Sequence, residues 1–171
     1  MIVAIDVGYV ETEAGVVGTC AAVAFTSFSS DEPLHETVVT VKDVAPYVPG
    51  RLFERELPCL LAALDAVARE TGRSAETVVI DGNVRLDPDG KPGLGMILYD
   101  SLDSATPVIG VAKNPFVGLD ALEVLRGESE NPLYVTAVGV SEPDAARQIQ
   151  SMAGGFRLPT LLKRADQLTR R

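Results

Sequence analysis

Apolar positions along the chain fall into short strand-like runs at first and into helical spacing later. The first third holds three strand-like runs, over residues 1–8, 15–26 and 36–42. Short polar connections that contain Gly, Ser, Asp and Pro separate them, which favours antiparallel pairing of the three strands. A loop over residues 43–50 follows, and the pattern then changes.

The change is to a helix, predicted from about Glu54 to Thr71. Its apolar positions recur at helical spacing, namely Leu57, Leu60, Leu61, Leu64 and Val67. Pro58 is compatible only with the first turn of a helix, which places the helix start near Glu54 or Arg55.

Strands and helices alternate through the rest of the chain. The pattern predicts strand 77–81, helix 94–102, strands 107–112, 121–126 and 132–140, a helix capped by Ser141 with Pro143 in its first turn, and a last helix from about Leu158 to the end. Three antiparallel strands, a helix and then strand–helix–strand is the element order of the ribonuclease H-like fold. We therefore predict an α/β protein with a mixed sheet flanked by helices, forming one domain over residues 1–171.

Composition narrows the function classes. Apolar residues make up 46% and aromatic residues 5% of the chain, so the core is aliphatic. Net charge is -9, with 15 Lys and Arg against 24 Asp and Glu, which disfavours tight non-specific binding to nucleic acid. A metal-bridged contact with a phosphate is still compatible with this charge, because the metal supplies the positive charge.

No membrane association is expected. The longest apolar stretch, residues 15–25, is shorter than the roughly 20 residues of a membrane span, and the start of the chain has no secretory pattern. We expect a cytoplasmic protein; its oligomeric state does not follow from the sequence. Cys20 and Cys59, isolated in sequence, are interpreted as buried structural thiols, and His35 as a surface or loop residue.

Four acidic residues suggest chemistry. Asp6 and Asp81 each belong to a buried apolar run, and in a ribonuclease H-like sheet these two strands are neighbours. Glu56 lies at helical spacing on the apolar side of its helix, and Asp166 lies beside the apolar stripe of the last helix. Carboxylates from separate elements that meet at one point indicate a divalent metal site with oxygen ligands.

Each residue also has an ordinary structural interpretation, and the residues alone leave both open. Asp6 and Asp81 fit turns, Glu56 fits a helix cap, and Asp166 fits a solvated ion pair with nearby basic residues. Lys113 either steadies a phosphate or extends its head from a strand end into solvent. The Pro46–Gly50 loop, which carries Tyr47, is either a rigid wedge between bases or a plain connection.

Five ordered blocks carry a resemblance to a known family. They are Ala4-Ile5-Asp6-Val7-Gly8; Pro46-Tyr47-Val48-Pro49-Gly50 with Arg55-Glu56; Val79-Ile80-Asp81-Gly82; Ile109-Gly110-Val111-Ala112-Lys113; and Arg157-Leu158-Pro159 with Ala165-Asp166. With these blocks the chain resembles the endonuclease V family, the deoxyinosine 3′ endonucleases, over most of its length.

The resemblance implies Mg²⁺-dependent phosphodiester hydrolysis, with Mn²⁺ as an alternative ion, next to a deaminated base that is flipped out of a DNA or RNA stack. It implies that Asp6, Glu56 and Asp81 bind the metal, with Asp166 nearby and Lys113 at the phosphate. The substrate-binding residues that it implies are Pro46, Tyr47, Val48 and Pro49 as the wedge, Leu52 and Gly93 at the base pocket, and Arg55.

The chain departs from the family pattern at several places. Asp87-Pro88 stands where the family has His-Pro, Asp89 replaces a basic residue, and Ile97 aligns with a second histidine. We expect these changes to make the site more acidic and to weaken its attraction for phosphate. The leading hypothesis is a metal-dependent endonuclease similar to this family. The alternatives are a catalytically weak or silent relative that binds nucleic acid or a protein, and a nuclease that acts on another structured or damaged DNA or RNA.

Overall fold

One mixed sheet organises the molecule. The computed structural model describes residues 1–13, 15–48 and 51–170. In chain order its elements are β1 (Ile2–Thr12), β2 (Gly15–Phe25), β3 (His35–Val41), α1 (Phe53–Thr71), β4 (Thr77–Asp81), α2 (Leu94–Ser101), β5 (Val108–Ala112), β6 (Leu122–Val124), β7 (Leu133–Val138), α3 (Glu142–Ser151) and α4 (Thr160–Leu168).

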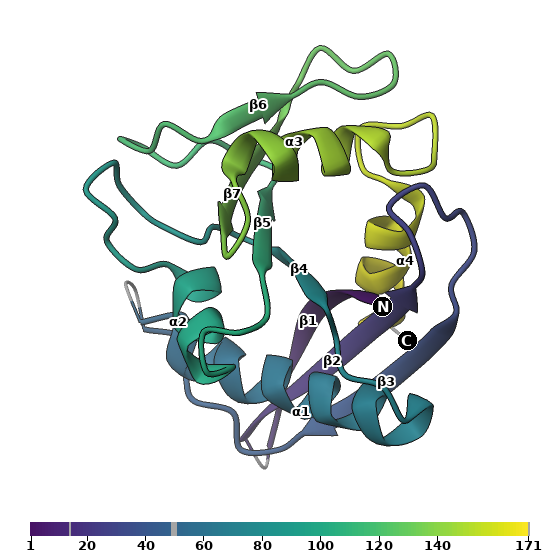
Figure 1. The fold of residues 1–171 in the computed structure, drawn as a ribbon. Helices are drawn as coiled ribbons and strands as arrows, with labels where there is room; N and C mark the ends of the chain where they lie inside the picture. Colours follow the sequence, from purple (N-terminus) through teal and green to yellow (C-terminus); the bar gives the residue numbers. More distant parts are fainter. Residues whose placement is uncertain (14, 49–50, 171) are drawn as a thin grey trace.

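The sheet order is β3-β2-β1-β4-β5-β7-β6. β1, β2 and β3 pair antiparallel, β4 lies parallel to β1 and β5, and β7 and β6 complete the sheet with antiparallel pairing. This arrangement confirms the predicted α/β, ribonuclease H-like fold and places the strands of Asp6 and Asp81 side by side (Figure 1).

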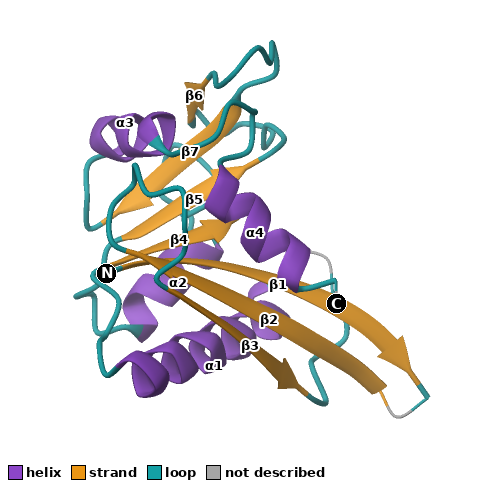
Figure 2. Cartoon of the chain, turned by 90° about the vertical axis from the view of Figure 1, so that its right-hand side faces the viewer, coloured by secondary structure: helices purple, strands orange, loops and turns teal. Residues whose placement is uncertain are grey.

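Helices cover both faces of the sheet (Figure 2). α1 and α2 pack on one face over a core that includes Val3, Ile5 and Ile80. α3 and α4 pack on the other over a core that includes Ala4, Val79 and Ile149. Because side chains alternate along a strand, neighbouring residues of β1 and β4 contribute to opposite cores. In the described ranges, no helix is both long enough and apolar enough to cross a bilayer.

Close packing against β1 fixes the position of α4. A Cβ built on Gly8 would lie 2.9 Å from the carbonyl oxygen of Thr169, just after α4. Only glycine therefore allows the end of this helix to approach the strand so closely. The contact fixes the position of α4 along β1, and with it the position of Asp166, three residues before Thr169, relative to Asp6.

Several element boundaries differ from the predictions. β1 runs to Thr12 rather than residue 8, because pairing with β2 continues to Thr12–Gly15. β6 is shorter than predicted, and the last helix begins at Thr160 because the backbone of Pro159, with φ -54° and ψ 149°, is not helical. α1 begins at Phe53, so Pro58 lies beyond its first turn.

The environments of Cys20, Cys59 and His35 agree only in part with the predictions from the sequence. Cys20 and Cys59 are buried and free, as predicted, but they are not isolated in space: a hydrogen bond between the thiols raises the pKa of Cys20 and lowers that of Cys59. His35 is not a loop residue. It opens β3, and its Nε2 lies 2.7 Å from Glu70 Oε2 at the end of α1.

Candidate active site

Asp6 and Asp81 occupy the open end of the β1–β4 ladder. This parallel ladder runs from Ile2–Thr77 to Ile5–Ile80, so the two aspartates are the next residues on adjacent strands. β4 ends at Asp81, while β1 continues beside β2 to Thr12. The carboxyl end of a parallel pair is where open α/β sheets place ligands.

Two small cavities lie at this end of the sheet. The first, about 20 Å³, is lined by Asp6, Asp81, Lys113 and Asp166 together with apolar residues of α4. The second, about 10 Å³, is lined by Asp6, Asp81 and Glu56 together with Leu60 and Leu94. Asp6 and Asp81 line both, so the structure brings together all four acidic residues that the sequence singled out.

Negative charge at the site is only partly compensated. Burial, followed by repulsion from Asp81, raises the pKa of Asp6 to about 6, although the carboxylate accepts a 2.9 Å hydrogen bond from the Val7 N–H. Burial and then repulsion from Asp81 and Asp6 raise the pKa of Glu56 to about 7. Both carboxyls would be stabilised in their ionised form by an added positive charge.

Lys113 supplies one such charge. Its Nζ lies 2.6 Å from Asp81 Oδ2 and 3.9 Å from Asp166 Oδ1. Burial lowers the pKa of Lys113, but the hydrogen bond and charge of Asp81 outweigh this effect and raise it. The lysine head thus lies among carboxylates instead of extending away from them. Asp166 also pairs with Arg170 at 2.8 Å, so its expected ion pair is present as well.

The donor set suits a hard divalent cation, because every candidate ligand is a carboxylate oxygen and two of the carboxyls are held at raised pKa. The side chains do not close around an ion as they lie. Within the described ranges, no three His, Cys, Asp or Glu side chains are grouped closely enough to hold one. The chemistry of the ligands therefore fits Mg²⁺, whereas chelation requires the carboxylates to turn inward.

Exposed apolar side chains precede α1, the helix that carries Glu56. Tyr47 is 62% exposed, and Val48, Leu52 and Pro46 are exposed as well. Pro49, the remaining residue assigned to the wedge, lies outside the described residues. An aromatic ring held in water beside a helix start is available to a ligand, as the wedge interpretation requires.

Arg55 takes part in a contact that the sequence did not predict. Its guanidinium carbon lies 3.6 Å from the centroid of the Tyr9 ring, and its positive charge lowers the pKa of neighbouring Glu56. The Tyr9 hydroxyl and the Arg55 Nε are buried without a hydrogen-bond partner among the described residues. Tyr9 was missed because the predicted strand ended at Gly8; continued alternation from Val7 to Tyr9 was the available signal.

Gly93 lies at the start of α2, whose Leu94 lines the second cavity. A Cβ on Gly93 would meet the carbonyl oxygen of Asn83 at 2.6 Å, so glycine lets the start of α2 lie against the chain that leaves β4. Leu94, the next residue, thus reaches the second cavity, and the role of Gly93 at a base pocket stays a prediction.

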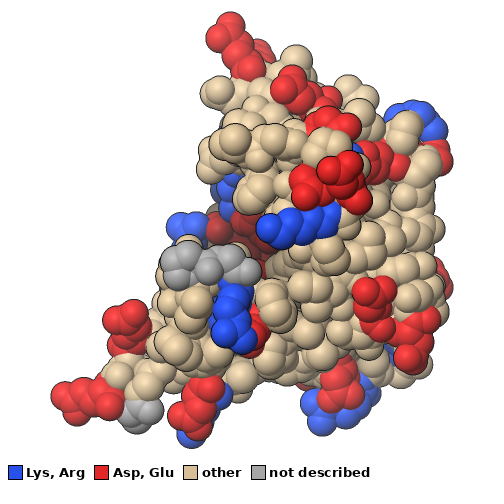
Figure 3. All heavy atoms as spheres, turned by 90° about the vertical axis from the view of Figure 1, so that its left-hand side faces the viewer, with Lys and Arg blue, Asp and Glu red and all other residues tan. Residues whose placement is uncertain are grey.

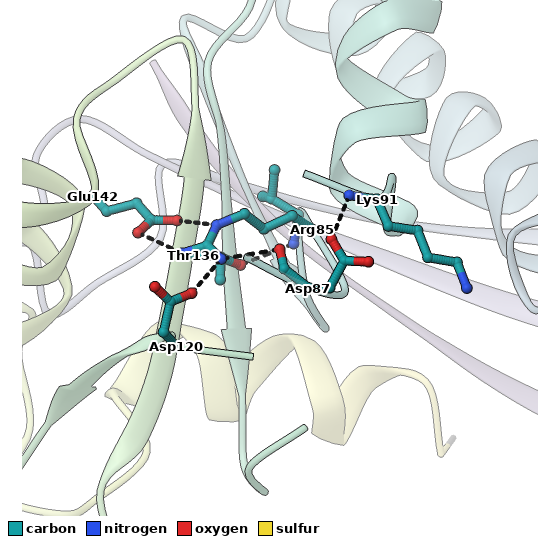
Figure 4. Close-up of polar contacts among 7 residues, drawn as sticks. Arg85, Asp87, Lys91, Asp120, Thr136 and Glu142 are labelled. Atoms are coloured by element: carbon teal, nitrogen blue, oxygen red, sulfur yellow. Dashed lines mark hydrogen bonds and ion pairs between the residues drawn. The ribbon is translucent and has the colours of Figure 1, made fainter. Parts of the chain in front are cut away.

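Asp87, in the loop between β4 and α2, forms hydrogen bonds within its own loop. The Asp87 carboxylate accepts a 2.8 Å hydrogen bond from the Lys91 N–H, and its carbonyl accepts one from Arg85 (Figure 4). Neither cavity is lined by Asp87 or Asp89. Asp87 therefore closes a turn within its own loop, and the expected effect of Asp87 and Asp89 on the acidity of the carboxylate site stays a prediction.

Fold and site together define a ribonuclease H-like α/β protein with clustered carboxylates at the end of its central strands. Residues 1–136 match the family model of endonuclease V. The chain belongs to the endonuclease V family. Asp166 lies beyond the matched range, so its place at the site comes from the structure.

Similar proteins agree with this assignment. The endonuclease V of Rhodospirillum centenum is 33% identical over 144 residues, which cover 71% of this chain and 57% of the relative. The chain thus spans a little over half the length of that curated relative.

Solved structures give the same fold. Endonuclease V of Streptomyces avermitilis is 30% identical with a TM-score of 0.75, over 99% of this chain and 79% of that one. Endonuclease V of Ciona intestinalis, solved in complex with DNA containing an inosine followed by a ribo-adenosine, has a TM-score of 0.79 at 19% identity, over 99% and 83% of the two chains.

Proposed function

We propose that the protein is a divalent-metal-dependent endonuclease that hydrolyses a phosphodiester near a deaminated base, inosine, in DNA or RNA. The observation that carries the proposal is the convergence of Asp6, Glu56, Asp81 and Asp166 on two adjoining cavities where the pairing of β1 with β4 ends. Family membership and the inosine-containing DNA bound by the Ciona relative support the substrate class.

In this proposal Asp6, Glu56 and Asp81 hold Mg²⁺, or Mn²⁺ in its place, and Asp166 adds a carboxylate beside them. A divalent cation bound there supplies Lewis acidity at the phosphate and lowers the pKa of a water molecule. The chain contributes the Lys113 ammonium, which stands at the same cavity and donates to a phosphate oxygen as negative charge develops.

The exposed residues before α1 position the substrate. Tyr47, with Pro46 and Val48, separates the deaminated base from the neighbouring bases, because its exposed ring offers a flat surface for stacking. Leu52 and Gly93 border the base. Arg55, whose guanidinium lies over the Tyr9 ring, also binds the substrate. Pro49 completes the wedge in the family pattern.

One observation favours a second function, a silent relative that binds nucleic acid without cleaving it. Lys113 already pairs with Asp81, and among the described residues no three acidic, His or Cys side chains are grouped to chelate an ion. If these contacts persist in solution, the site holds no metal ion to activate a water molecule, and binding of nucleic acid rests on residues outside the carboxylates.

Nicking assays separate the two functions. We expect the wild type to nick inosine-containing DNA or RNA with Mg²⁺ or Mn²⁺, and Asp6→Asn to lower the rate at least about 100-fold by removing a ligand. Asp65→Asn is the matched control, because Asp65 is 68% exposed on α1 and, among the described residues, pairs with Arg69. Equal traces from the wild type and Asp6→Asn, with oligonucleotide binding intact, would support the silent relative instead.

A further inference from the structure

A buried arginine holds the loop between α3 and α4. Arg126 is 6% exposed, and its guanidinium donates hydrogen bonds to the carbonyl oxygens of Met152, Gly154 at 3.1 Å and Phe156 at 3.0 Å. Charged donors make stronger hydrogen bonds than neutral ones, and a buried cation without them would be costly. The loop backbone is therefore fixed from residue 152 to residue 156.

A second arginine ties the same loop to the carboxylate site. Arg157 donates from Nη2 to the carbonyl oxygens of Lys113 and, at 2.7 Å, of Pro132. Lys113 is the residue whose ammonium pairs with Asp81. The loop is thus anchored to the backbone of a residue at the candidate active site.

This fixed loop presents an aromatic ring to solvent. Phe156 is 73% exposed, in a chain whose aromatic content is only 5%. The Lys163 ammonium lies 5.5 Å from the centroid of the Phe156 ring. An exposed aromatic ring with a cation over one of its faces combines the two groups that bind one nucleotide, a ring surface for the base and a charge for the phosphate.

The ring borders an open groove of about 600 Å³. Its lining includes Phe156, Arg157 and Lys163 from one side and Glu128 and Ser129 from the other. Leu158 and Asp166 line both this groove and the first carboxylate cavity. The groove therefore adjoins the cavity where the phosphodiester would be cleaved.

We propose that this groove binds an unpaired nucleotide of the substrate strand, next to the cleaved phosphodiester, with its base stacked on Phe156 and its phosphate paired with Lys163. The inference rests on the proposed function, because the strand reaches the groove only if it passes the carboxylates. Stacking on Phe156 accepts any base, so the groove contributes affinity and not recognition of inosine. The arginine-fixed loop keeps the ring in place before the strand arrives.

Photocrosslinking tests the contact directly. The probe is a short single-stranded DNA with one inosine and one 5-iodouridine, moved through the positions on either side of the inosine, in a buffer without divalent metal so that nothing is cleaved. We expect one position to crosslink, with mass spectrometry placing the adduct on Phe156. A crosslink that appears only at other residues, from every probe position, would overturn the inference.

Affinity measurements on variants complete the test. Phe156→Ala should weaken binding of the same DNA about 5- to 100-fold, Phe156→Trp should restore it, and Lys163→Ala should weaken it about fivefold. Leu34→Ala is the apolar control: it is 50% exposed and its N–H bonds to Ala24, at the other end of the sheet. Lys42→Ala, an exposed lysine at the end of β3, is the control for charge.

The outcomes separate this inference from the proposed function. Nicking by the wild type with unchanged affinity in Phe156→Ala and Lys163→Ala would overturn the groove and leave the nuclease proposal standing. Crosslinking to Phe156 and loss of affinity in Phe156→Ala, without nicking by the wild type, would support the groove in a protein that binds without cleaving.

Discussion

Asp6 and Glu56 show how individual residues are held in an unfavourable state at the end of the sheet. Each carboxyl is buried next to other carboxyls, and the pKa values of about 6 and about 7 exceed the ordinary values of 3.8 and 4.5. A raised pKa means that the folded protein binds the proton more tightly than the unfolded chain does. The stability linked to these protons is full below pH 4 or so and is lost as the pH rises through about 6 to 7.

Stability of the metal-free protein should therefore fall over this pH window. Above the pKa of Glu56, Asp6→Asn should raise the free energy of unfolding by about 1 to 3 kcal/mol, because it removes a buried charge, and the gain should shrink below pH 5. Thermal unfolding with a chelator across the pH range measures the effect, beside Asp65→Asn. A gain that is the same at every pH would rule out burial of the charge as its cause.

Lys113 is the counterpart of these acids. Replacing it by Met removes the hydrogen-bonded partner of Asp81 and the proposed donor to the phosphate. We expect the nicking rate to fall about 100-fold and Lys113→Arg to retain part of it, because the charge is kept at a different geometry. Lys42→Met is the control. An unchanged rate in Lys113→Met, with nicking by the wild type established, would remove Lys113 from the mechanism.

Among the elements, the loop between β4 and α2 is held in part by one arginine. Arg85, 17% exposed, pairs with Glu142 at the start of α3 and with Asp120, and the adjacent Val84 N–H bonds to Thr136 of β7 (Figure 4). These contacts hold the chain that leaves Asp81 against β7 and α3. The loop begins at the candidate site and is stabilised well away from it.

Breaking this network should loosen the loop without touching a carboxylate of the site. Arg85→Met should lower the free energy of unfolding by about 1 to 3 kcal/mol, because the half-buried Glu142 loses its partner. Arg147→Met is the control, since its pair with Asp144 is exposed and contributes little. Urea unfolding gives both values. Equal small losses in the two variants would contradict a structural role for Arg85.

Element order was predictable from the sequence because each buried strand is a short apolar run, and this order made β1 and β4 neighbours. The positions of Asp6 and Asp81 followed from that alone. The roles of Arg126 and Arg157 could not be predicted, because their partners are backbone carbonyls of distant segments. Every residue has a carbonyl, so the sequence does not indicate which ones accept these hydrogen bonds. The Tyr9–Arg55 contact was hidden for a related reason, since it depends on how far β1 pairs with β2.

At the scale of the whole molecule, the negative charge of the protein opposes the approach of a nucleic acid. Net charge is -9, and acidic side chains are spread over the face seen in Figure 3, with a few Lys and Arg side chains among them. A nucleic acid would therefore be repelled at long range, and the proposed binding has to rest on a small number of close contacts. Lys113 and Lys163 are the cations that the two proposals assign to phosphates.

Binding of single-stranded DNA should accordingly depend only weakly on salt. Two phosphate contacts predict a slope of about -1.4 for log K against log salt concentration, and Lys163→Ala should reduce its magnitude by about 0.7. Fluorescence anisotropy over a salt series, without divalent metal, measures both slopes, with Lys42→Ala as the control. A steep slope that Lys163→Ala leaves unchanged would mean that other cations carry the contact.

Arg126 gives that salt series a clean interpretation. Its charge is satisfied by carbonyl groups inside the protein, where dissolved ions screen interactions much less than at the surface. The loop around Phe156 should therefore keep one shape from dilute buffer to concentrated salt. Any change in affinity along the series then reports on the nucleic acid leaving the protein, and not on the protein changing its own conformation.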